Sequence, residues 1–224
     1  GTEKAYGDFR QLIAASGFCG SAREREPGWY QDKLLPGKSE AFIIPSEVSY
    51  VALGGIGEYT GEDYLLGRMV SFDYLWAKIR AEGGAYGCQM SVLPNQSWTM
   101  SSYRDPNVKR TIETFRNTSS WLKDLELGEQ ELLNYKIGAV AGYDRTPKTY
   151  VQAKRMDSWY LRQEEPQVRA KVREGVLKAS EEDLKNRRQA MESFAGEGTV
   201  CVLGNRAKIE EAAGQFDNVT VLME

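Results

Sequence analysis

The alternation of hydrophobic and polar residues is clearest between residues 61 and 82. Apolar side chains recur there at alternating steps of four and three residues, at Leu65, Met69, Phe72, Trp76 and Ile79. This spacing is typical of one face of an amphipathic helix. Thr60 and Asp63 form a capping-box pattern before it, and Gly83 and Gly84 can end a helix in a left-handed conformation. The pattern predicts a helix over about residues 61–82, packed through its apolar face.

Strand patterns occur in three parts of the chain. Residues 40–53 predict two short strands separated by Pro45, which cannot donate to a strand ladder. Residues 86–103 predict an antiparallel hairpin whose turn is Pro94-Asn95-Gln96. The segments TVCVLGN and NVTVLM near the end predict two more short strands, with a helix between them.

Helix signals fill most of the second half. Asp105-Pro106 and Thr146-Pro147 each place a capping residue before a proline, which predicts a helix start. Ser180 and Asp183 form another capping box, for a helix that reaches Phe194. We therefore predict an α+β fold with a mainly antiparallel sheet and helices packed on one face. Residues 1–39, weakly helical at 3–15, are expected to be a leading segment or a linker from a preceding domain, and residues 40–224 the α+β domain.

Composition adds little about partners. The 224 residues are 41% hydrophobic, and the net charge is only −3. Basic residues between 164 and 188 alternate with acidic ones, which favours a solvated helix face over a nucleic-acid surface. No apolar run is long enough to cross a bilayer. We expect a soluble protein, cytoplasmic if bacterial, that binds neither nucleic acid nor membrane; the Gly1-Thr2 start suggests a fragment of something longer.

The sequence contains no histidine. Zincin, Ser-His-Asp and Cys-His chemistries therefore lack their key residue. Cys19, Cys88 and Cys201 are far apart and form no CxxC pair. We expect no metal or other cofactor in this chain.

The glycine-rich connection GGIGEYTG, residues 54–61, lies between a predicted strand and a helix, where a dinucleotide fingerprint would lie. Gly55 and Gly57 fit the first two positions of GxGxxG, but Thr60 replaces the third glycine. We interpret the connection as a structural turn, and an unrelated nucleotide-binding enzyme stays as an alternative.

The segment YLWAKIRAEGGAYG, followed by SYRDPN and the helix TIETF, resembles the last domain of the presequence-protease branch of pitrilysin/insulinase zinc metallopeptidases. The likeness extends through EAFIIPSEVSYVALGG before it and SWYLRQEEPQVRAKVREGVLKASEEDL after it, over roughly residues 40–204. It implies four related α+β domains, two in each half, that close around an unfolded peptide. The zinc site would lie in the N-terminal half, where an inverted H-x-x-E-H motif binds the metal.

The resemblance also implies a role for the pattern R-x5-Y around the Gly-Gly-Ala turn, whose arginine and tyrosine reach across the chamber to the substrate. The matching residues are Arg80 and Tyr86, with Gly83, Gly84 and Ala85 between them. A phenol can donate to the oxyanion formed at the scissile carbonyl, and a guanidinium can bind peptide carbonyls.

The residues alone also allow a purely structural interpretation. Arg80 near a helix C-terminus complements the helix dipole. Tyr86 shares strand parity with Cys88 and Met90 and could point into the core. Tyr103 and Arg104 in SYRDPN could line the same chamber, but we expect them to be structural residues at the end of the sheet.

Two functions follow from the resemblance. The first is a noncatalytic, substrate-binding C-terminal domain of a zinc metalloendopeptidase that degrades unfolded peptides, inactive alone. Its partners would be the other domains of the same polypeptide and the peptide. The alternative is a free-standing noncatalytic scaffold or adaptor subunit.

Overall fold

The computed structural model describes residues 2–17, 37–161 and 166–223, and the chain divides into two compact units, residues 1–37 and 38–224. The described part of the first unit is helix α1 (Glu3–Ala15), as the sequence predicts. The Thr2 hydroxyl caps this helix by accepting a hydrogen bond from the Ala5 amide, and none of its residues is buried. The second unit contains the sheet and its core.

The sheet has six strands in the order β3-β4-β2-β5-β1-β6. Their bounds are β1 Glu40–Ile43, β2 Ser49–Ile56, β3 Gly87–Val92, β4 Ser97–Asp105, β5 Thr199–Gly204 and β6 Asn218–Val221. β1 pairs in parallel with β5 and β6, and the other three pairings are antiparallel. The predicted α+β class with a mainly antiparallel sheet is confirmed, and Pro45 lies between β1 and β2 as expected.

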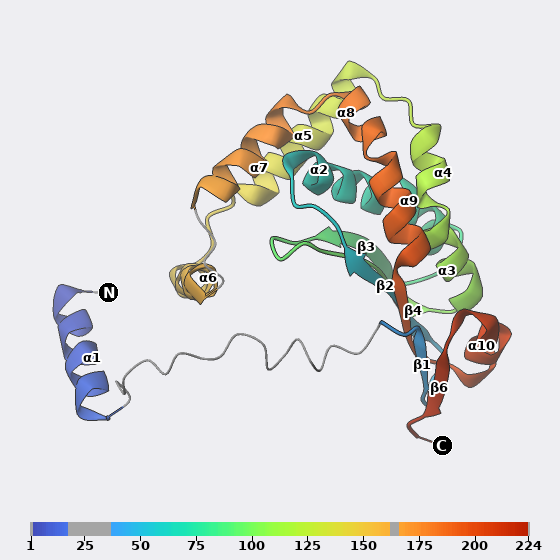
Figure 1. The fold of residues 1–224 in the computed structure, drawn as a ribbon, viewed down its shortest axis with the longest axis horizontal. Coiled ribbons are helices and arrows are strands. Elements are labelled where there is room, and N and C mark those ends of the chain that lie inside the picture. The colour runs from blue at the N-terminus through green and yellow to red at the C-terminus, as the bar shows by residue number, and fades with distance from the viewer. Residues whose placement is uncertain (1, 18–36, 162–165, 224) are drawn as a thin grey trace. The chain divides into compact units, whose positions relative to one another are not determined.

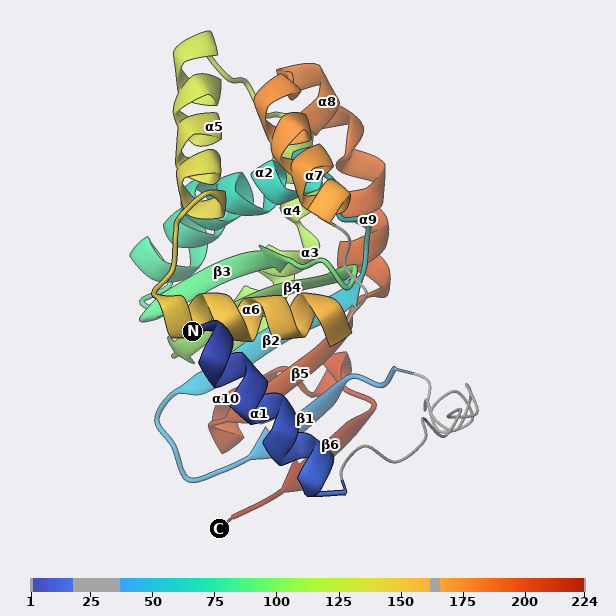
Figure 2. The same ribbon diagram turned by 90° about the vertical axis from the view of Figure 1, so that its left-hand side faces the viewer.

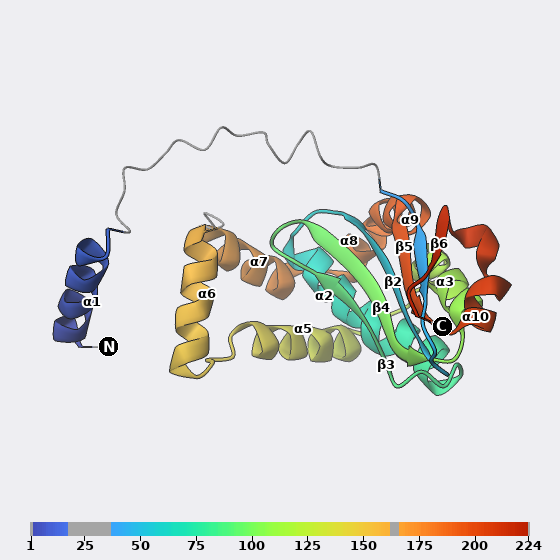
Figure 3. The ribbon, with the colours of Figure 1, turned by 90° about the horizontal axis from the view of Figure 1, so that it is seen from below.

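Helices cover one face of this sheet (Figure 1). The helices of the second unit are α2 Gly61–Met69, η2 Val70–Ala81, α3 Val108–Arg116, α4 Thr118–Lys123, α5 Glu129–Tyr143, α6 Thr149–Leu161, α7 Pro166–Lys178, α8 Glu181–Asn186, α9 Arg188–Glu197, α10 Arg206–Glu211 and the 3₁₀ turn η3 Ala213–Gln215, and of these α6 buries none of its residues. Helices α5 and α7 pack on each other and on α2 (Figures 2 and 3). The strands bury alternate residues toward the helices, among them Leu53, Trp98 and Met100.

The central helix differs from the predicted one in its second half. From Val70 to Ala81 it is a π-helix, whose i→i+5 hydrogen bonds widen each turn. Buried side chains therefore recur at steps of four and five residues, at Val70, Tyr74, Leu75 and Ile79. Leu65, Met69 and Ile79 are buried as predicted, but Phe72 and Trp76 are 54% and 42% exposed. The predicted stripe is wrong at these two residues because it assumed α-helical spacing throughout.

The predicted helix caps are confirmed where the two residues of the cap are three positions apart in the sequence. Thr60 accepts a hydrogen bond from the Asp63 amide, and Ser180 and Asp183 make both bonds of a capping box. The helix expected at Asp105-Pro106 begins later, with Asn107 as the N-cap residue. Asp105 is fully buried at the end of β4, where it accepts hydrogen bonds from the Asn107 amide (2.8 Å) and the Thr111 hydroxyl (2.7 Å). Its carboxylate thus fixes the β4–α3 connection, and α6 likewise begins at Thr149, two residues after Pro147.

The glycine-rich connection is shaped by close packing. The Trp98 ring covers Gly57, where an added Cβ would lie 2.3 Å from the ring, and the Trp98 indole N–H donates to the Glu58 carbonyl over 2.7 Å. At Gly61 an added Cβ would lie 2.3 Å from the Val176 amide nitrogen of α7. These contacts account for two of its glycines without a nucleotide.

Candidate functional site

The turn between η2 and β3 sets the positions of the first two candidate residues, Arg80 and Tyr86. Gly84 has φ +80°, a left-handed conformation that glycine adopts without strain. Its amide donates to the Arg80 carbonyl (3.0 Å), and the Ala85 amide donates to the Ile79 carbonyl (3.1 Å). Gly83 passes so close to the helix end that an added Cβ would lie 2.5 Å from the Ile79 oxygen. The helix therefore ends in a tight glycine cap, as predicted, and the chain reverses directly into β3.

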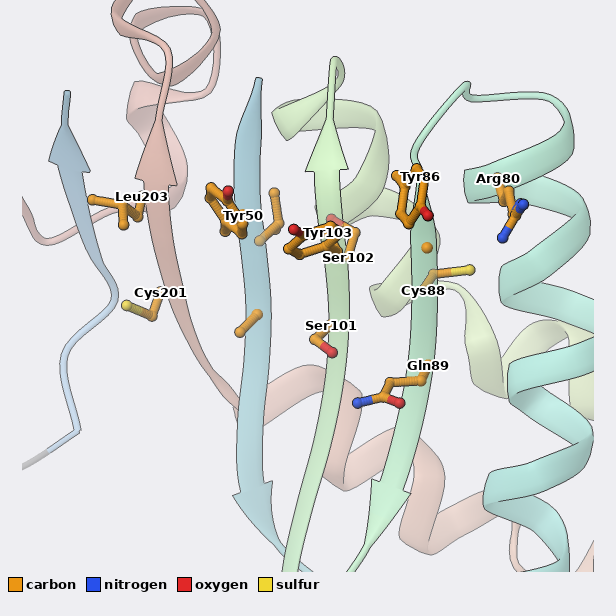
Figure 4. A pocket seen from close by; sticks show the side chains of 13 residues that line it. Tyr50, Arg80, Tyr86, Cys88, Gln89, Ser101, Ser102, Tyr103, Cys201 and Leu203 are labelled. Carbon is orange, nitrogen blue, oxygen red and sulfur yellow. The ribbon is translucent and has the colours of Figure 1, made fainter. Parts of the chain in front are cut away.

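Arg80 on η2 and Tyr86 at the start of β3 lie next to each other at the β3 edge of the sheet, and both line one pocket (Figure 4). The Arg80 guanidinium carbon is 4.0 Å from the centre of the Trp76 ring and 5.9 Å from the centre of the Tyr86 ring. Within the described residues, this guanidinium has no hydrogen-bonded or ion-pair acceptor. Cation–π contact holds the cation in place while its donors stay available to a ligand.

Tyr86 is 66% exposed. It precedes the first residue of β3, so the strand alternation that buries Met90 does not extend to it. Its amide donates to the Tyr103 carbonyl over 3.1 Å, which fixes its backbone at the end of β4. The interpretation of Tyr86 as a core residue is therefore wrong.

Two further tyrosines complete a row of rings. The Tyr103 ring lies 5.7 Å from the Tyr86 ring and 5.3 Å from the Tyr50 ring, in edge-to-face arrangements. A bulge at the end of β4 contributes to this geometry: the β2–β4 register shifts there, and Arg104 has φ +50°. Tyr103 thus lines the pocket, so the structural role favoured for it from the sequence is incomplete, whereas Arg104 is not among the lining residues. Tyr50 was not predicted as a site residue. Its alternation with Val51 and Leu53, which are buried, could have indicated that it lies on the opposite face of the sheet.

These residues surround a pocket of about 660 Å³. It is lined by Tyr50, Val51, Ala52, Arg80, Tyr86, Gly87, Cys88, Gln89, Ser101, Ser102, Tyr103, Cys201 and Leu203. Arg80 is the one charged residue of this lining. A pocket of this size with apolar walls and a few convergent polar groups is typical of a ligand-binding site.

The thiols of the pocket are poor nucleophiles. Burial, with a smaller contribution from the Asp105 carboxylate, raises the pKa of Cys88 to about 11. Burial first, and the Glu40 carboxylate second, also raise the pKa of Cys201. Both side chains are therefore neutral thiols near pH 7, and the pocket offers hydrogen-bond donors and ring surfaces.

Metal-ligating side chains do not gather in the described ranges. No three Cys, Asp or Glu residues among them are arranged to hold an ion, and the sequence has no histidine. No helix in this part of the chain is both long and apolar enough to cross a membrane.

Comparison with known proteins identifies relatives much longer than this chain. Protein HypA of Clostridium perfringens is 31% identical over 224 residues, which are 98% of this chain and 23% of that protein. Presequence protease 1, chloroplastic/mitochondrial, of Arabidopsis thaliana is 28% identical over 84% of this chain and 18% of its own length. The chain thus spans about a fifth of either relative.

Solved structures share the fold at low sequence identity. A protease from Helicobacter pylori superposes with a TM-score of 0.56 at 17% identity, over 75% of this chain and 44% of that one. Pitrilysin superposes with a TM-score of 0.51 at 17% identity, over 75% of this chain and 19% of that one. The family model described as the PreP C-terminal domain matches residues 39–205. The chain therefore belongs to the family of presequence-protease C-terminal domains, and it shares its fold with a domain of pitrilysin.

Proposed function

We propose that this domain binds unfolded peptide for a zinc metalloendopeptidase whose zinc site lies in the N-terminal half of the same polypeptide. The observation that carries the proposal is the placement of Arg80 beside the Trp76 and Tyr86 rings, where it lines an open pocket. A guanidinium without an acceptor among the described residues is suited to an acceptor on a ligand. A peptide in extended conformation offers such acceptors as backbone carbonyls.

Arg80 and Tyr86 would have different roles. Arg80 would hold the peptide by its carbonyls, which supports binding in the ground state and in the transition state. Tyr86 would donate its phenolic proton to the oxyanion that develops at the scissile carbonyl. The metal would activate the attacking water from the other half of the enzyme.

Replacement of Arg80 by lysine in the full-length polypeptide is expected to raise the apparent KM for peptides more than it lowers kcat. Lysine keeps the positive charge but loses the planar fork that can bind two acceptors at once. Steady-state kinetics with an unfolded peptide measures both constants. Arg206→Lys is the matched control, since Arg206 is exposed on α10 and lies outside the pocket. A fall in kcat with unchanged KM would contradict the assigned role.

The purified 224-residue chain is expected to hold no stoichiometric zinc and to hydrolyse no unfolded peptide. The sequence has no histidine, and among the described residues no Cys, Asp and Glu side chains gather to hold zinc, so the metal that would activate water is not expected here. Elemental analysis after desalting and a peptide-cleavage assay test both statements. One equivalent of zinc retained against a mild chelator would contradict the first.

The gene distinguishes the two candidate functions. An H-x-x-E-H motif upstream in the same reading frame would support a peptidase, and the absence of this motif would support a scaffold.

A further inference from the structure

Beside the Arg80–Tyr86 pair, the open face of the sheet has a floor of small side chains. Ala52 on β2 pairs with Ser101 on β4 and with Cys201 on β5, so three neighbouring strands each contribute one small residue. Since residues paired across strands point to the same face, these side chains lie side by side. Figure 4 shows Ser101 and Cys201 on this level.

A wall of large side chains borders this floor. Tyr50 pairs with Leu203 on β5, and its ring contacts the Tyr103 ring edge to face, with 71° between the ring planes. The two rings are 38% and 49% exposed. The wall therefore offers a ring face and a ring edge at nearly right angles, the two surfaces that a third aromatic ring prefers to contact.

The charge of the pocket lining limits which peptide side chains the pocket can bind. Its lining contains no carboxylate, and Arg80 supplies its one formal charge. A lysine or arginine side chain of a peptide would therefore find no counterion here and would be repelled by Arg80. An uncharged aromatic side chain meets rings, a thiol and a hydroxyl, all of which it contacts favourably.

The spacing of the strands gives the separation between this floor and Tyr86. The floor centres on β4, β2 and β5, whereas Tyr86 lies at the start of β3, next to β4. Strands lie about 4.8 Å apart and an extended peptide advances about 3.3 Å per residue. A peptide crossing the strands would thus place a side chain over the floor about three residues away from the residue that contacts Tyr86.

We propose that Tyr50, Tyr103 and Leu203, above the floor of Ala52, Ser101 and Cys201, form a subsite for one uncharged aromatic side chain of the bound peptide. The proposal rests on the proposed function, because it assumes that the open face binds peptide. It adds a specificity that Arg80 and Tyr86 cannot provide, since both would act on groups common to every peptide.

The test uses the 224-residue chain and two synthetic peptides of glycine, serine and alanine that differ at one central position, Phe or Ala. Dissociation constants are measured by NMR titration to millimolar peptide. The Phe peptide is expected to bind about tenfold more tightly, as an aromatic contact and its apolar burial require. Tyr50→Ser, which removes the wall, and Ala52→Leu, which fills the floor, should each bring this ratio close to one. Tyr160→Ser is the control, since Tyr160 is 84% exposed on α6 and outside the pocket.

A ratio near one in the unaltered chain, including absence of binding for both peptides, would overturn the subsite. Retention of the ratio in both pocket variants would overturn it as well. Arg80→Gln separates this proposal from the proposed function: it should weaken both peptides by the same factor and keep the ratio. If Arg80→Gln changes neither dissociation constant while the Phe preference persists, the subsite stands and the role of Arg80 fails.

Discussion

Replacement of Tyr86 by phenylalanine in the full-length polypeptide is expected to lower kcat by about 100-fold or more, the usual cost of removing one donor to an oxyanion. The substitution removes only the hydroxyl and keeps the ring that contacts Tyr103 and Arg80. In the described part of the chain, this hydroxyl makes no hydrogen bond. Because the loss is confined to the transition state, kcat and kcat/KM should fall together.

Thermal unfolding of the Tyr86→Phe variant should match that of the unaltered protein, because the Tyr86 side chain is 66% exposed. Tyr160→Phe provides a control for the loss of a solvent-exposed tyrosine hydroxyl elsewhere. If turnover stays unchanged in Tyr86→Phe, the phenol has no part in the chemistry. If activity and melting temperature fall in parallel, Tyr86 has a structural role instead.

Local signals in the sequence account for the elements that were predicted correctly. The Thr60 cap and the Ser180 capping box each join residues three positions apart, so their spacing alone specifies the contact. The glycine pair before Ala85 likewise encodes the turn that delivers Tyr86, because only glycine adopts φ +80° at Gly84 without strain. Arg80 and Tyr86 flank this turn, but they were singled out by the resemblance of the segment to the presequence-protease family and not by the turn itself.

The π-helix could not be predicted from hydrophobic spacing. Leu65, Met69, Phe72, Trp76 and Ile79 fit an α-helical stripe almost perfectly, and only the wider turns of η2 expose Phe72 and Trp76. This exposure has a consequence for the site: Trp76 lies four residues before Arg80 and packs against its guanidinium. A residue assigned to the core thus positions the cation of the candidate site.

The row of tyrosine rings was beyond sequence analysis for a different reason. Tyr50, Tyr86 and Tyr103 come together through strand order and register, and the order within the sheet is not readable from local patterns. The bulge at Arg104 changes that register by one residue, which reverses the side to which a side chain points. Pairwise contacts between distant segments therefore decided which exposed aromatic residues form the pocket.

Replacement of Gly61 by alanine is expected to lower the free energy of unfolding by about 3 kcal/mol, the upper range for overpacking a core. An added Cβ would lie 2.3 Å from the Val176 amide nitrogen and 2.4 Å from the Val172 carbonyl oxygen, both in the backbone of α7. Backbone atoms cannot rotate away as a side chain can, so α2 and α7 must separate. Urea denaturation of the purified chain measures the loss.

Gly138→Ala is the control for this substitution. Gly138 lies within α5, and its added Cβ would approach only the end of the Arg68 side chain, at 3.9 Å. Because alanine lowers the entropy of the unfolded chain, this variant should gain about 0.4–1 kcal/mol. If Gly61→Ala were as stable as Gly138→Ala, α2 and α7 would not pack as closely as the structure has them. The glycine of the GGIGEYTG connection would then need an explanation other than helix packing, and ligand binding at this turn would again have to be tested.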